Sequence, residues 1–394
     1  MVGQFSAIDY PEMIQFLRRL VQTPSPSTQE GAVAALIVEE LKRLGFPEVR
    51  VDSMGNVIAR LAAGDGPILL YDAHMDTVEA GEGAAWRYDP YAAVIEDDVL
   101  YGRGAMDMKG AIAAMVYGAK ALLAQGLPKH GSLVLAFVVQ EEPCEGLAIR
   151  HVIEGLDARP DYCVLGEATN LGLARGHRGR LEAQITLRGR SAHASMPQEG
   201  NNSVYAAARV IVGIELLAQQ LNHDSALGRG SITVTEINSQ AESRNAVPHL
   251  CELWVDRRLT GDETEVKALT ELRRVIAREG VAGEVAVTNY QATSYTGFAC
   301  QTRQYFPSWL LPESHPFLAR CAQALEVSMG SRPRTLCWQF STDGVYTAGA
   351  AGIPTLGFGP GEERYAHTCD DQVRLADVHA AARGYAAIAA EILG

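Results

Sequence analysis

The sequence predicts an α/β fold with a mixed, mostly parallel sheet covered by helices and an inserted ferredoxin-like lid. Apolar runs alternate with helical patterns through the first 180 residues, which is typical of strands buried between layers of helices. After Arg180 the pattern changes to half-exposed strands, and further α/β elements follow near the C-terminus. We therefore expect one discontinuous α/β domain that is interrupted by a second domain.

Length and composition agree with this prediction and exclude some partners. A chain of 394 residues exceeds what one hydrophobic core usually supports, and 47% hydrophobic residues indicate a folded protein. The net charge of -13 argues against nucleic acid as a partner. No apolar run approaches the roughly 18 residues that span a bilayer, and the first residues show no secretory signal. Seven scattered cysteines without a CxxC pair fit reduced thiols in the cytoplasm.

The first domain begins with helices and buried strands. Asp9 is positioned to cap a helix that has Pro11 in its first turn. Residues 27–30 have the form of a capping box before a helix that stops at Gly45. Residues 108–123 follow a helical pattern, so Asp107 lies at a helix amino end. Buried strands are expected at 68–73, 133–139 and 162–165.

A different order of elements follows in the middle of the chain. Strands are expected at 181–187, 231–237, 250–257 and 284–290, with helices at 202–217 and 263–278. The order β-α-β-β-α-β is that of a ferredoxin-like domain. This places a lid at residues 180–294 and divides the catalytic domain into residues 1–179 and 295–394, with residues 301–307 as the return linker.

Side chains that bind metals follow the buried strands, at the points where these strands end. The candidates are His74, Asp107, Glu142, Glu167 and His367. Ligand sites of open α/β sheets lie beyond the carboxyl ends of the strands, so these residues can meet at one edge. Two divalent ions about 3.5–4 Å apart can clamp an attacking water and a reacting carbonyl, and one carboxylate can bridge them. Asp107 is the candidate bridge, although the local pattern fits a plain helix cap equally well.

Two adjacent acids, Glu141 and Glu142, end one of the buried apolar strands. A solvated pair is the alternative interpretation. However, burying two carboxylates is costly unless a cation receives them. This favours metal binding by at least one of the two.

These residues resemble the motifs of a known family of metallopeptidases, which includes acetylornithine deacetylase, succinyl-diaminopimelate desuccinylase and glutamate carboxypeptidase. The resemblance covers essentially the whole chain and implies a zinc-peptidase-like catalytic domain. The motifs that carry it are His74–Met–Asp76–Thr, Gly102–Arg–Gly–Ala–Met–Asp107–Met–Lys–Gly110, Glu141–Glu142, Gly166–Glu167 and the late His367.

The resemblance implies a role for each of these residues. It implies two zinc ions bridged by Asp107, of which one is completed by His74 and Glu167 and the other by Glu142 and His367. Glu141 would be the general base that takes a proton from water, and Asp76 would orient the imidazole of His74. Mixed imidazole and carboxylate ligands suit zinc but also admit cobalt or manganese.

The resemblance also implies roles for lid residues. His193 matches a lid histidine that stabilises the oxyanion, and in dimeric members it reaches the partner's site, so a homodimer is expected. Arg258 resembles a residue that recognises a substrate carboxylate, and Asn245 resembles a polar substrate contact. Gly359 lies in a glycine-rich loop of the catalytic domain that can approach the substrate closely. The alternatives are a surface position for His193, an ion pair of Arg258 with Asp256 and a turn at Asn245.

We therefore expect a cytoplasmic, metal-dependent amide-bond hydrolase that acts on an N-acyl amino acid or a small peptide with a free carboxylate. An aminopeptidase or dipeptidase of the same family is the alternative. A non-catalytic binding protein is disfavoured, because the ligands and Glu141 are all present. Residues 176–180 and 341–361 are similar, less specifically, to hydrolases linked to selenium metabolism.

Overall fold

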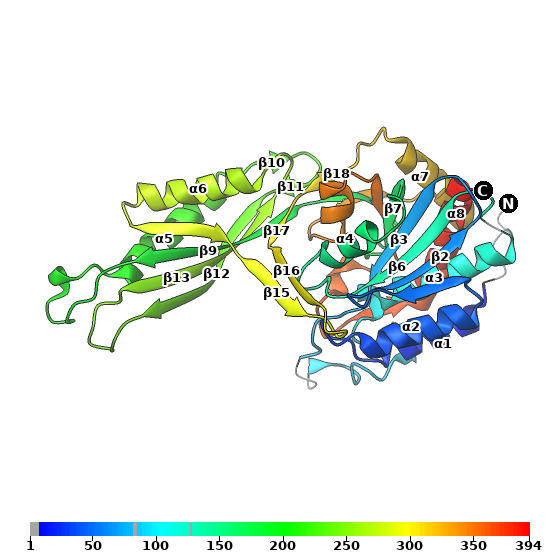
Figure 1. Ribbon diagram of the computed structural model, residues 1–394, viewed down its shortest axis with the longest axis horizontal. Helices are drawn as coiled ribbons and strands as arrows, with labels where there is room; N and C mark the ends of the chain where they lie inside the picture. The colour runs from blue at the N-terminus through cyan, green and yellow to red at the C-terminus, as the bar shows by residue number, and fades with distance from the viewer. Residues whose placement is uncertain (1–7, 82–84, 127) are drawn as a thin grey trace.

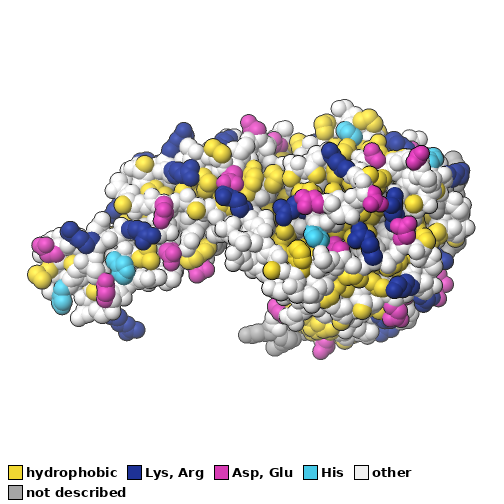
Figure 2. Space-filling model, viewed as in Figure 1, with side chains coloured by type: hydrophobic (Ala, Val, Ile, Leu, Met, Phe, Trp, Pro, Cys, Tyr) yellow, Lys and Arg dark blue, Asp and Glu magenta, His cyan; other side chains and the backbone are white. Residues whose placement is uncertain are grey.

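Two sheets, one mixed and one antiparallel, lie in separate parts of the molecule, and the antiparallel part projects from the larger body (Figures 1 and 2). The computed structural model describes residues 8–81, 85–126 and 128–394. Residues 1–7, where the sequence predicts no secretory signal, lie outside this part. Within it, no helix is long and apolar enough to cross a membrane. The predicted fold class, a helix-covered mixed sheet with a separate antiparallel lid sheet, is confirmed.

The body is built on the mixed sheet, whose strands follow the order β1-β2-β6-β3-β7-β20-β8-β18, with β19 paired to β8. The four neighbours β6, β3, β7 and β20 run parallel, so their carboxyl ends meet at one edge. These strands are β1 (Glu48–Val51), β2 (Val57–Ala62), β3 (Ile68–His74), β6 (Ser132–Val138), β7 (Tyr162–Leu165), β8 (Leu173–His177), β18 (Trp309–Leu310), β19 (Thr335–Trp338) and β20 (Thr355–Gly357). The strands predicted at 68–73, 133–139 and 162–165 are confirmed as β3, β6 and β7.

Helices cover this sheet because its strands are apolar on both faces. In β3, Tyr71 reaches α8, where its hydroxyl donates to the Tyr385 carbonyl at 2.6 Å. The next residue, Asp72, points to the other face, as alternation along a strand requires. The helices of the body are α1 (Tyr10–Val21), α2 (Gly31–Arg43), α3 (Gly110–Ala124), α4 (Leu147–Glu154), α7 (Pro316–Met329) and α8 (Leu375–Leu393). A small sheet of β4 (Val94–Glu96), β5 (Val99–Tyr101) and β21 (Gln372–Arg374) adjoins them.

Of the two helix caps predicted near the N-terminus, one forms and the other does not. Asp9 caps α1 as predicted, accepting from the Glu12 N–H at 3.0 Å. The capping box predicted at residues 27–30 is wrong, because Glu30 makes no side-chain cap to α2. The Ser27 hydroxyl instead donates to the Asp76 carboxylate at 2.6 Å. A tertiary partner thus replaced the local one.

The lid has the predicted ferredoxin-like topology. Its sheet is antiparallel in the order β12-β13-β9-β14, and α5 and α6 pack on it through an apolar core of their own. The elements are β9 (Gly179–Arg188), α5 (Ser203–Ala218), β10 (His223–Asp224), β11 (Gly228–Arg229), β12 (Ser231–Gln240), β13 (Leu250–Leu259), α6 (Glu265–Arg278) and β14 (Gly283–Val287). The division of the chain at residues 180 and 294 stays a prediction.

The return from the lid is a paired structure where the sequence suggested a linker. Strands β15 (Asn289–Thr293) and β16 (Ala299–Arg303) form an antiparallel hairpin, and β17 (Tyr305–Phe306) pairs with β9. Residues 301–307 therefore belong mostly to strands, and the linker prediction is wrong for them. Figure 1 shows this hairpin running from the lid sheet to the body.

One buried histidine, His177, is held in its neutral form by the fold. His177, at the end of β8, is fully buried beside Trp309 and Trp338. Its Nδ1 must donate to the Arg178 carbonyl at 2.8 Å, and its Nε2 must accept from the Thr342 N–H at 3.2 Å, so the ring is neutral. Burial lowers the pKa of His177 to about 4.

We predict that His177 makes the fold acid-sensitive. An exposed histidine, as in the unfolded chain, titrates at pH ~6.5, whereas His177 in the folded chain titrates at pH ~4. Between these two values the unfolded chain has a proton on this residue and the folded chain does not. This contribution to stability is complete above pH ~6.5 and is lost as the pH falls to ~4, by at most ~1.4 kcal/mol per pH unit. Calorimetric unfolding of His177→Gln across this range should show a weaker dependence on pH. His223→Gln, which removes an exposed histidine, is the control. An unchanged profile in His177→Gln would contradict the assignment.

Candidate metal centre

The predicted metal ligands come together at the carboxyl edge of the parallel strands. His74 ends β3, Glu142 follows β6, and Glu167 follows β7. His367 lies in the segment after β20, and Asp107 lies in a π-helical turn, η2 (Ala105–Lys109), before α3. Four neighbouring parallel strands thus supply or lead to four of the five side chains, as expected for ligand sites in α/β sheets.

Asp107 occupies the centre of this cluster. Its Oδ1 lies 3.0 Å from His74 Nε2, and its Oδ2 lies 3.4 Å from His367 Nε2. The two oxygens of one carboxylate therefore face two imidazoles from distant parts of the chain. This is the arrangement that a bridging ligand requires. The competing interpretation as a cap is not supported, because α3 begins at Gly110 and its N-cap residue is Lys109.

The remaining ligands form a group on each side of Asp107. Glu142 Oε2 lies 2.8 Å from His367 Nε2, and Glu167 Oε1 lies 3.7 Å from His74 Nε2. Oxygen and nitrogen donors also converge within 4.8 Å in the sets His74–Glu141–Glu167 and His74–Asp107–Glu142. The second set combines residues from both sides of Asp107, so the two sides lie close together. The individual distances divide the cluster into two sides, with His74 and Glu167 on one and His367 and Glu142 on the other.

The carboxylates of this cluster are buried, so their negative charge is stable only beside positive charge. Burial raises the pKa of Glu141 well above its ordinary value, and burial together with Asp107 does the same for Glu167. Burial alone would also raise the pKa of Asp107, but hydrogen bonds from His367 and His74 outweigh it and lower that pKa. Hydrogen bonds to Asp107 and Glu142 raise the pKa of His367 to about 10. Positive charge is thus favoured here, and the donor set fits divalent ions.

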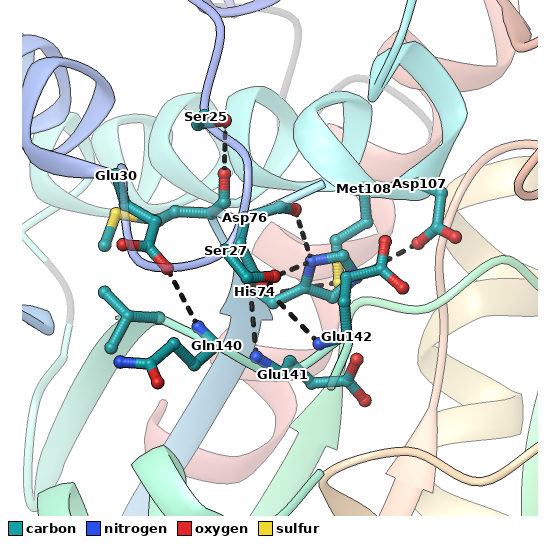
Figure 3. Close-up of polar contacts among 12 residues, drawn as sticks. Ser25, Ser27, Glu30, His74, Asp76, Asp107, Met108, Gln140, Glu141 and Glu142 are labelled. Atoms are coloured by element: carbon teal, nitrogen blue, oxygen red, sulfur yellow. Dashed lines mark hydrogen bonds and ion pairs between the residues drawn. The ribbon is translucent and has the colours of Figure 1, made fainter. Parts of the chain in front are cut away.

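Asp76 holds the backbone of the two glutamates. Its Oδ1 accepts from the Glu141 N–H at 3.1 Å, and its Oδ2 accepts from the Glu142 N–H at 3.3 Å (Figure 3). The imidazole of His74 is bonded at Nδ1 to the backbone carbonyl of Asp76 at 2.9 Å, whereas the Asp76 carboxylate lies 3.7 Å away. The residue therefore orients the imidazole mainly through its main chain. Its carboxylate positions the loop after β6.

Sequence reasoning missed Asp371, which clamps the loop that carries Asp107. Its carboxylate accepts from the Gly104 N–H at 2.6 Å and from the Met106 N–H at 3.0 Å, and it pairs with Arg103 at 3.2 Å. The side chain is buried, and burial raises its pKa to about 7. Its position four residues after His367 could have identified Asp371, because one segment can supply both a metal ligand and a residue that holds a neighbouring ligand loop.

A pair of buried acids behind the ligands was also missed. Asp72 and Asp343 lie together, and burial raises the pKa of each, that of Asp343 to about 6. Asp72 Oδ1 and Asp343 Oδ2 have no other partner among the described residues, so one shared proton would join them. Asp72 lies two residues before His74 on one strand and therefore on the same face. That spacing could have identified Asp72, but nothing local identifies Asp343.

The structure places the predicted lid residues outside this cluster. His193 and Asn245 lie beside each other, since the Ala194 N–H donates to the Asn245 carbonyl at 2.8 Å and His193 bridges to Ala246. His193 is exposed, with its Nδ1 2.7 Å from the Ser195 hydroxyl. These residues follow the outer end of β9, whose ten residues span roughly 30 Å from the junction with the body. Their catalytic and substrate-binding roles stay predictions.

Arg258 lies near the junction and Gly359 lies within the body, and the polar groups of both are already engaged. Arg258 of β13 lies opposite Arg180 of β9 in the lid sheet, close to the junction. Its guanidinium donates to the Asp256 carboxylate at 2.8 and 3.2 Å. The backbone N–H of Gly359 donates to the Thr169 hydroxyl at 3.0 Å. A Cβ at Gly359 would lie 2.5 Å from the Glu167 carbonyl, so glycine is needed here for close packing behind a ligand.

Together, the side chains at the strand ends and the central Asp107 form a cluster of imidazoles and carboxylates that could hold metal ions. A model of the peptidase family M20/M25/M40 matches residues 70–391, and the chain belongs to that family of metallohydrolases of peptide and amide bonds. It is 39% identical to the "Uncharacterized protein YgeY" of Escherichia coli (strain K12) over 97% of this chain and 95% of that protein.

More distant relatives share the whole length. The chain is 29% identical to a succinyl-diaminopimelate desuccinylase of Methylorubrum extorquens, over 91% of this chain and 93% of that one. Its fold matches the Bacillus subtilis YXEP protein, described as a dinuclear metal-binding peptidase of the M20 family. That match has a TM-score of 0.70 at 18% identity and covers 98% of each chain.

We predict that Asp371→Asn weakens metal binding without unfolding the protein. The amide nitrogen of asparagine cannot accept, so one of the two N–H bonds to the Asp107 loop is lost. Removing a partner that orients a metal site typically costs about 10–100-fold in affinity. Isothermal titration of the metal-free protein with zinc measures this, and Asp370→Asn, at the exposed neighbouring position, is the control. Equal affinities in the two variants would show that the clamp is not needed.

Proposed function

We propose that the protein hydrolyses the amide bond of an N-acyl amino acid, or of a small peptide with a free carboxylate, using Glu141 as the general base. One observation carries this proposal: Asp107 presents its two oxygens to His74 and His367, and Glu141 lies in the same cluster. A structural salt bridge would not require so many buried carboxylates in one place. A two-ion centre does.

The residues of the site suit each step of amide hydrolysis. Two divalent ions, zinc in the first instance and cobalt or manganese as alternatives, would supply the positive charge that activates a water and polarises the substrate carbonyl. Glu141 takes the proton of the attacking water and later delivers it to the leaving nitrogen. Burial raises the pKa of its carboxyl, and the positive charge of bound ions would favour the deprotonated form that a base needs at the start.

The substrate class is inferred from the junction between body and lid. Arg258 lies at this end of the lid, and a substrate carboxylate would compete with Asp256 for its guanidinium. One relative is named a succinyl-diaminopimelate desuccinylase, which supports an N-acyl amino acid as the substrate. An aminopeptidase or dipeptidase would have to recognise a free amine, so matched peptides with free and acetylated amino termini distinguish these functions.

We further propose that the enzyme is a homodimer in which His193 serves the partner's site. Helix α5 exposes Tyr205, Val212 and Leu216 at helical spacing, so they form one apolar stripe. Strand β12 beside it forms an open edge of the lid sheet and exposes Ile237. A second lid covering both features would bury them. It would also give His193 a role at a distance from its own cluster.

We also infer a cytoplasmic location. All seven cysteines are free thiols, and five of them are buried. Burial raises the pKa of Cys163 and Cys321, so these thiols stay protonated and unreactive. Such cysteines act as small core residues, and they are stable in a reducing compartment.

The proposal predicts that Glu141→Gln abolishes turnover while two metal ions stay bound. Loss of a general base typically lowers the rate by about 10²–10⁴-fold. The assay is a panel of N-acetyl, N-succinyl and N-formyl amino acids and dipeptides, with added zinc, cobalt or manganese. Metal content is measured by elemental analysis. Glu142→Gln is the matched variant, because it alters a predicted ligand at the next position and should lower the metal content as well.

Either of two results would contradict this function. Wild-type protein that binds two ions but hydrolyses no member of the panel would exclude the substrate class. Glu141→Gln protein with near-normal turnover would exclude the role of Glu141 and leave the metal centre intact.

The dimer proposal predicts complementation between two inactive variants. A mixture of Glu141→Gln and His193→Ala subunits contains heterodimers in which one site has both residues intact. Random pairing of refolded subunits should restore about one quarter of the wild-type activity. A mixture of Glu141→Gln with Asp107→Ala is the control and stays inactive, because each subunit then carries a defect in the body residues of its own site. No recovery in the first mixture, or a monomer in light scattering, would contradict action from the partner.

A further inference from the structure

The loop that carries Glu141 is fixed to the body through its backbone. Gln140, Glu141 and Glu142 present three consecutive N–H groups, and two buried carboxylates accept all of them. Glu30 Oε1 accepts from the Gln140 N–H at 3.1 Å, and Asp76 accepts from the other two (Figure 3). These contacts all come from the body. They fix the main chain at the point where β6 ends.

Gln140 is an unusual residue at this point. It is completely buried, and its φ of 55° is in the left-handed region, which few non-glycine residues adopt. A residue in this conformation persists only where its surroundings hold it. The conformation turns the chain directly before Glu141, so whatever holds Gln140 also sets the direction of the next side chain.

The side chain of Gln140 is held by the hairpin that returns from the lid. The Tyr290 hydroxyl of β15 donates to Gln140 Oε1 at 2.8 Å, and the Cys300 thiol of β16 lies 3.6 Å from the same oxygen. The Nε2 atom of Gln140 has no partner among the described residues. Every hydrogen bond of this side chain within the described part of the chain is therefore made to the hairpin.

The same hairpin is anchored at both of its ends. At its base, the Thr288 N–H donates to the Glu182 carbonyl of β9 at 3.0 Å, which ties it to the lid sheet. At its tip, Tyr295 packs on Gly31 and Gly55, and its hydroxyl donates to the Gly55 carbonyl at 2.9 Å. Gln140 is contacted between these anchors. The hairpin thus forms a continuous connection from the lid sheet to the loop of the catalytic base.

We propose that Gln140 is a positioning residue through which Tyr290 of the hairpin sets the geometry of Glu141. The inference rests on the proposed role of Glu141 as the base. Tyr290 and Cys300 of the hairpin then hold the side chain of Gln140, so a shift of the hairpin relative to this loop changes the direction of Glu141. Gln140 itself touches neither substrate nor metal in this scheme, and its effect is on the rate of the chemical step.

Two tyrosines of the hairpin provide a matched test. Tyr290→Phe removes the hydroxyl that reaches Gln140, and Tyr295→Phe removes the hydroxyl that reaches the Gly55 carbonyl. Both variants keep the ring, and each loses one hydrogen bond between hairpin and body. A purely structural brace would be weakened by either change. A positioning contact is lost only in the first.

The first measurement is amide hydrogen exchange of the metal-loaded protein, and it requires no substrate. We expect exchange over residues 140–142 to be about tenfold faster in Tyr290→Phe, the size of effect expected from one buried hydrogen bond. We expect Tyr295→Phe to match the wild type there. Equal exchange in both variants and the wild type would overturn the proposal. This measurement stands even if the substrate panel shows no hydrolysis, which would refute the proposed function alone.

The second measurement is steady-state kinetics on a substrate identified by the panel. In Tyr290→Phe, kcat should fall about tenfold, with KM and metal content within about twofold of the wild type. Tyr295→Phe should keep its kcat. Gln140→Asn retains a residue that tolerates the left-handed region but is too short to reach Tyr290. If Tyr290 acts through Gln140, adding Tyr290→Phe to Gln140→Asn causes no further loss. Losses that multiply in the double variant would overturn the proposal.

Discussion

The structure depends on the burial of several carboxylates at one edge of a parallel sheet. Asp107, Glu141 and Glu167 lie where water is largely excluded, and their negative charges must be balanced by imidazoles, protons or metal ions. His74 and His367 supply part of this balance, because hydrogen bonds to Asp107 raise the pKa of each imidazole. Divalent ions would take over that function. The affinity for metal is therefore a result of how the chain folds.

A second constraint follows, because ligands on loops are useful only if the loops are rigid. The chain meets it repeatedly in one way: a buried carboxylate accepts one or two backbone N–H groups from a neighbouring loop. Asp76 does this for the loop after β6, Asp371 for the loop before α3, and Asp343 for the start of α4, where it accepts from the Gly146 N–H at 2.6 Å. Each carboxylate thus accepts backbone N–H groups that would be bonded to carbonyls in a helix or a strand. Much of the acidity near the site is thus structural.

The sequence was sufficient for features set by local pattern. Buried strands show as apolar runs, and because parallel strands end at a common edge, residues such as His74 and Glu167 could be placed together without coordinates. The order of elements likewise identified the ferredoxin-like lid. Features set by long-range pairing could not be predicted. Ser27 looked like part of a capping box but bonds Asp76, and the acid partner of Asp72 lies 271 residues away, at Asp343.

The return segment illustrates the same limit. In β16 only Cys300 is buried, which is too little to create a strand pattern, so residues 301–307 resembled a linker. The position of His193 could not be read from its motif either, because the distance from the body is set by the length and direction of β9. Motifs identify residue types and spacing. They do not give the path of the chain between them.

The junction of lid and body has a consequence for how the two parts of the chain are connected. Gly179, at the start of β9, and Phe306, at the end of β17, touch each other: a Cβ at Gly179 would lie 2.4 Å from the Phe306 carbonyl. Exit and entry are adjacent, and the described metal ligands all lie on the body side. The lid thus occupies the place of a surface loop, which is where domains are inserted with least damage. Because its two ends touch, the segment between them could be replaced by a short turn without separating the two ends of the body chain.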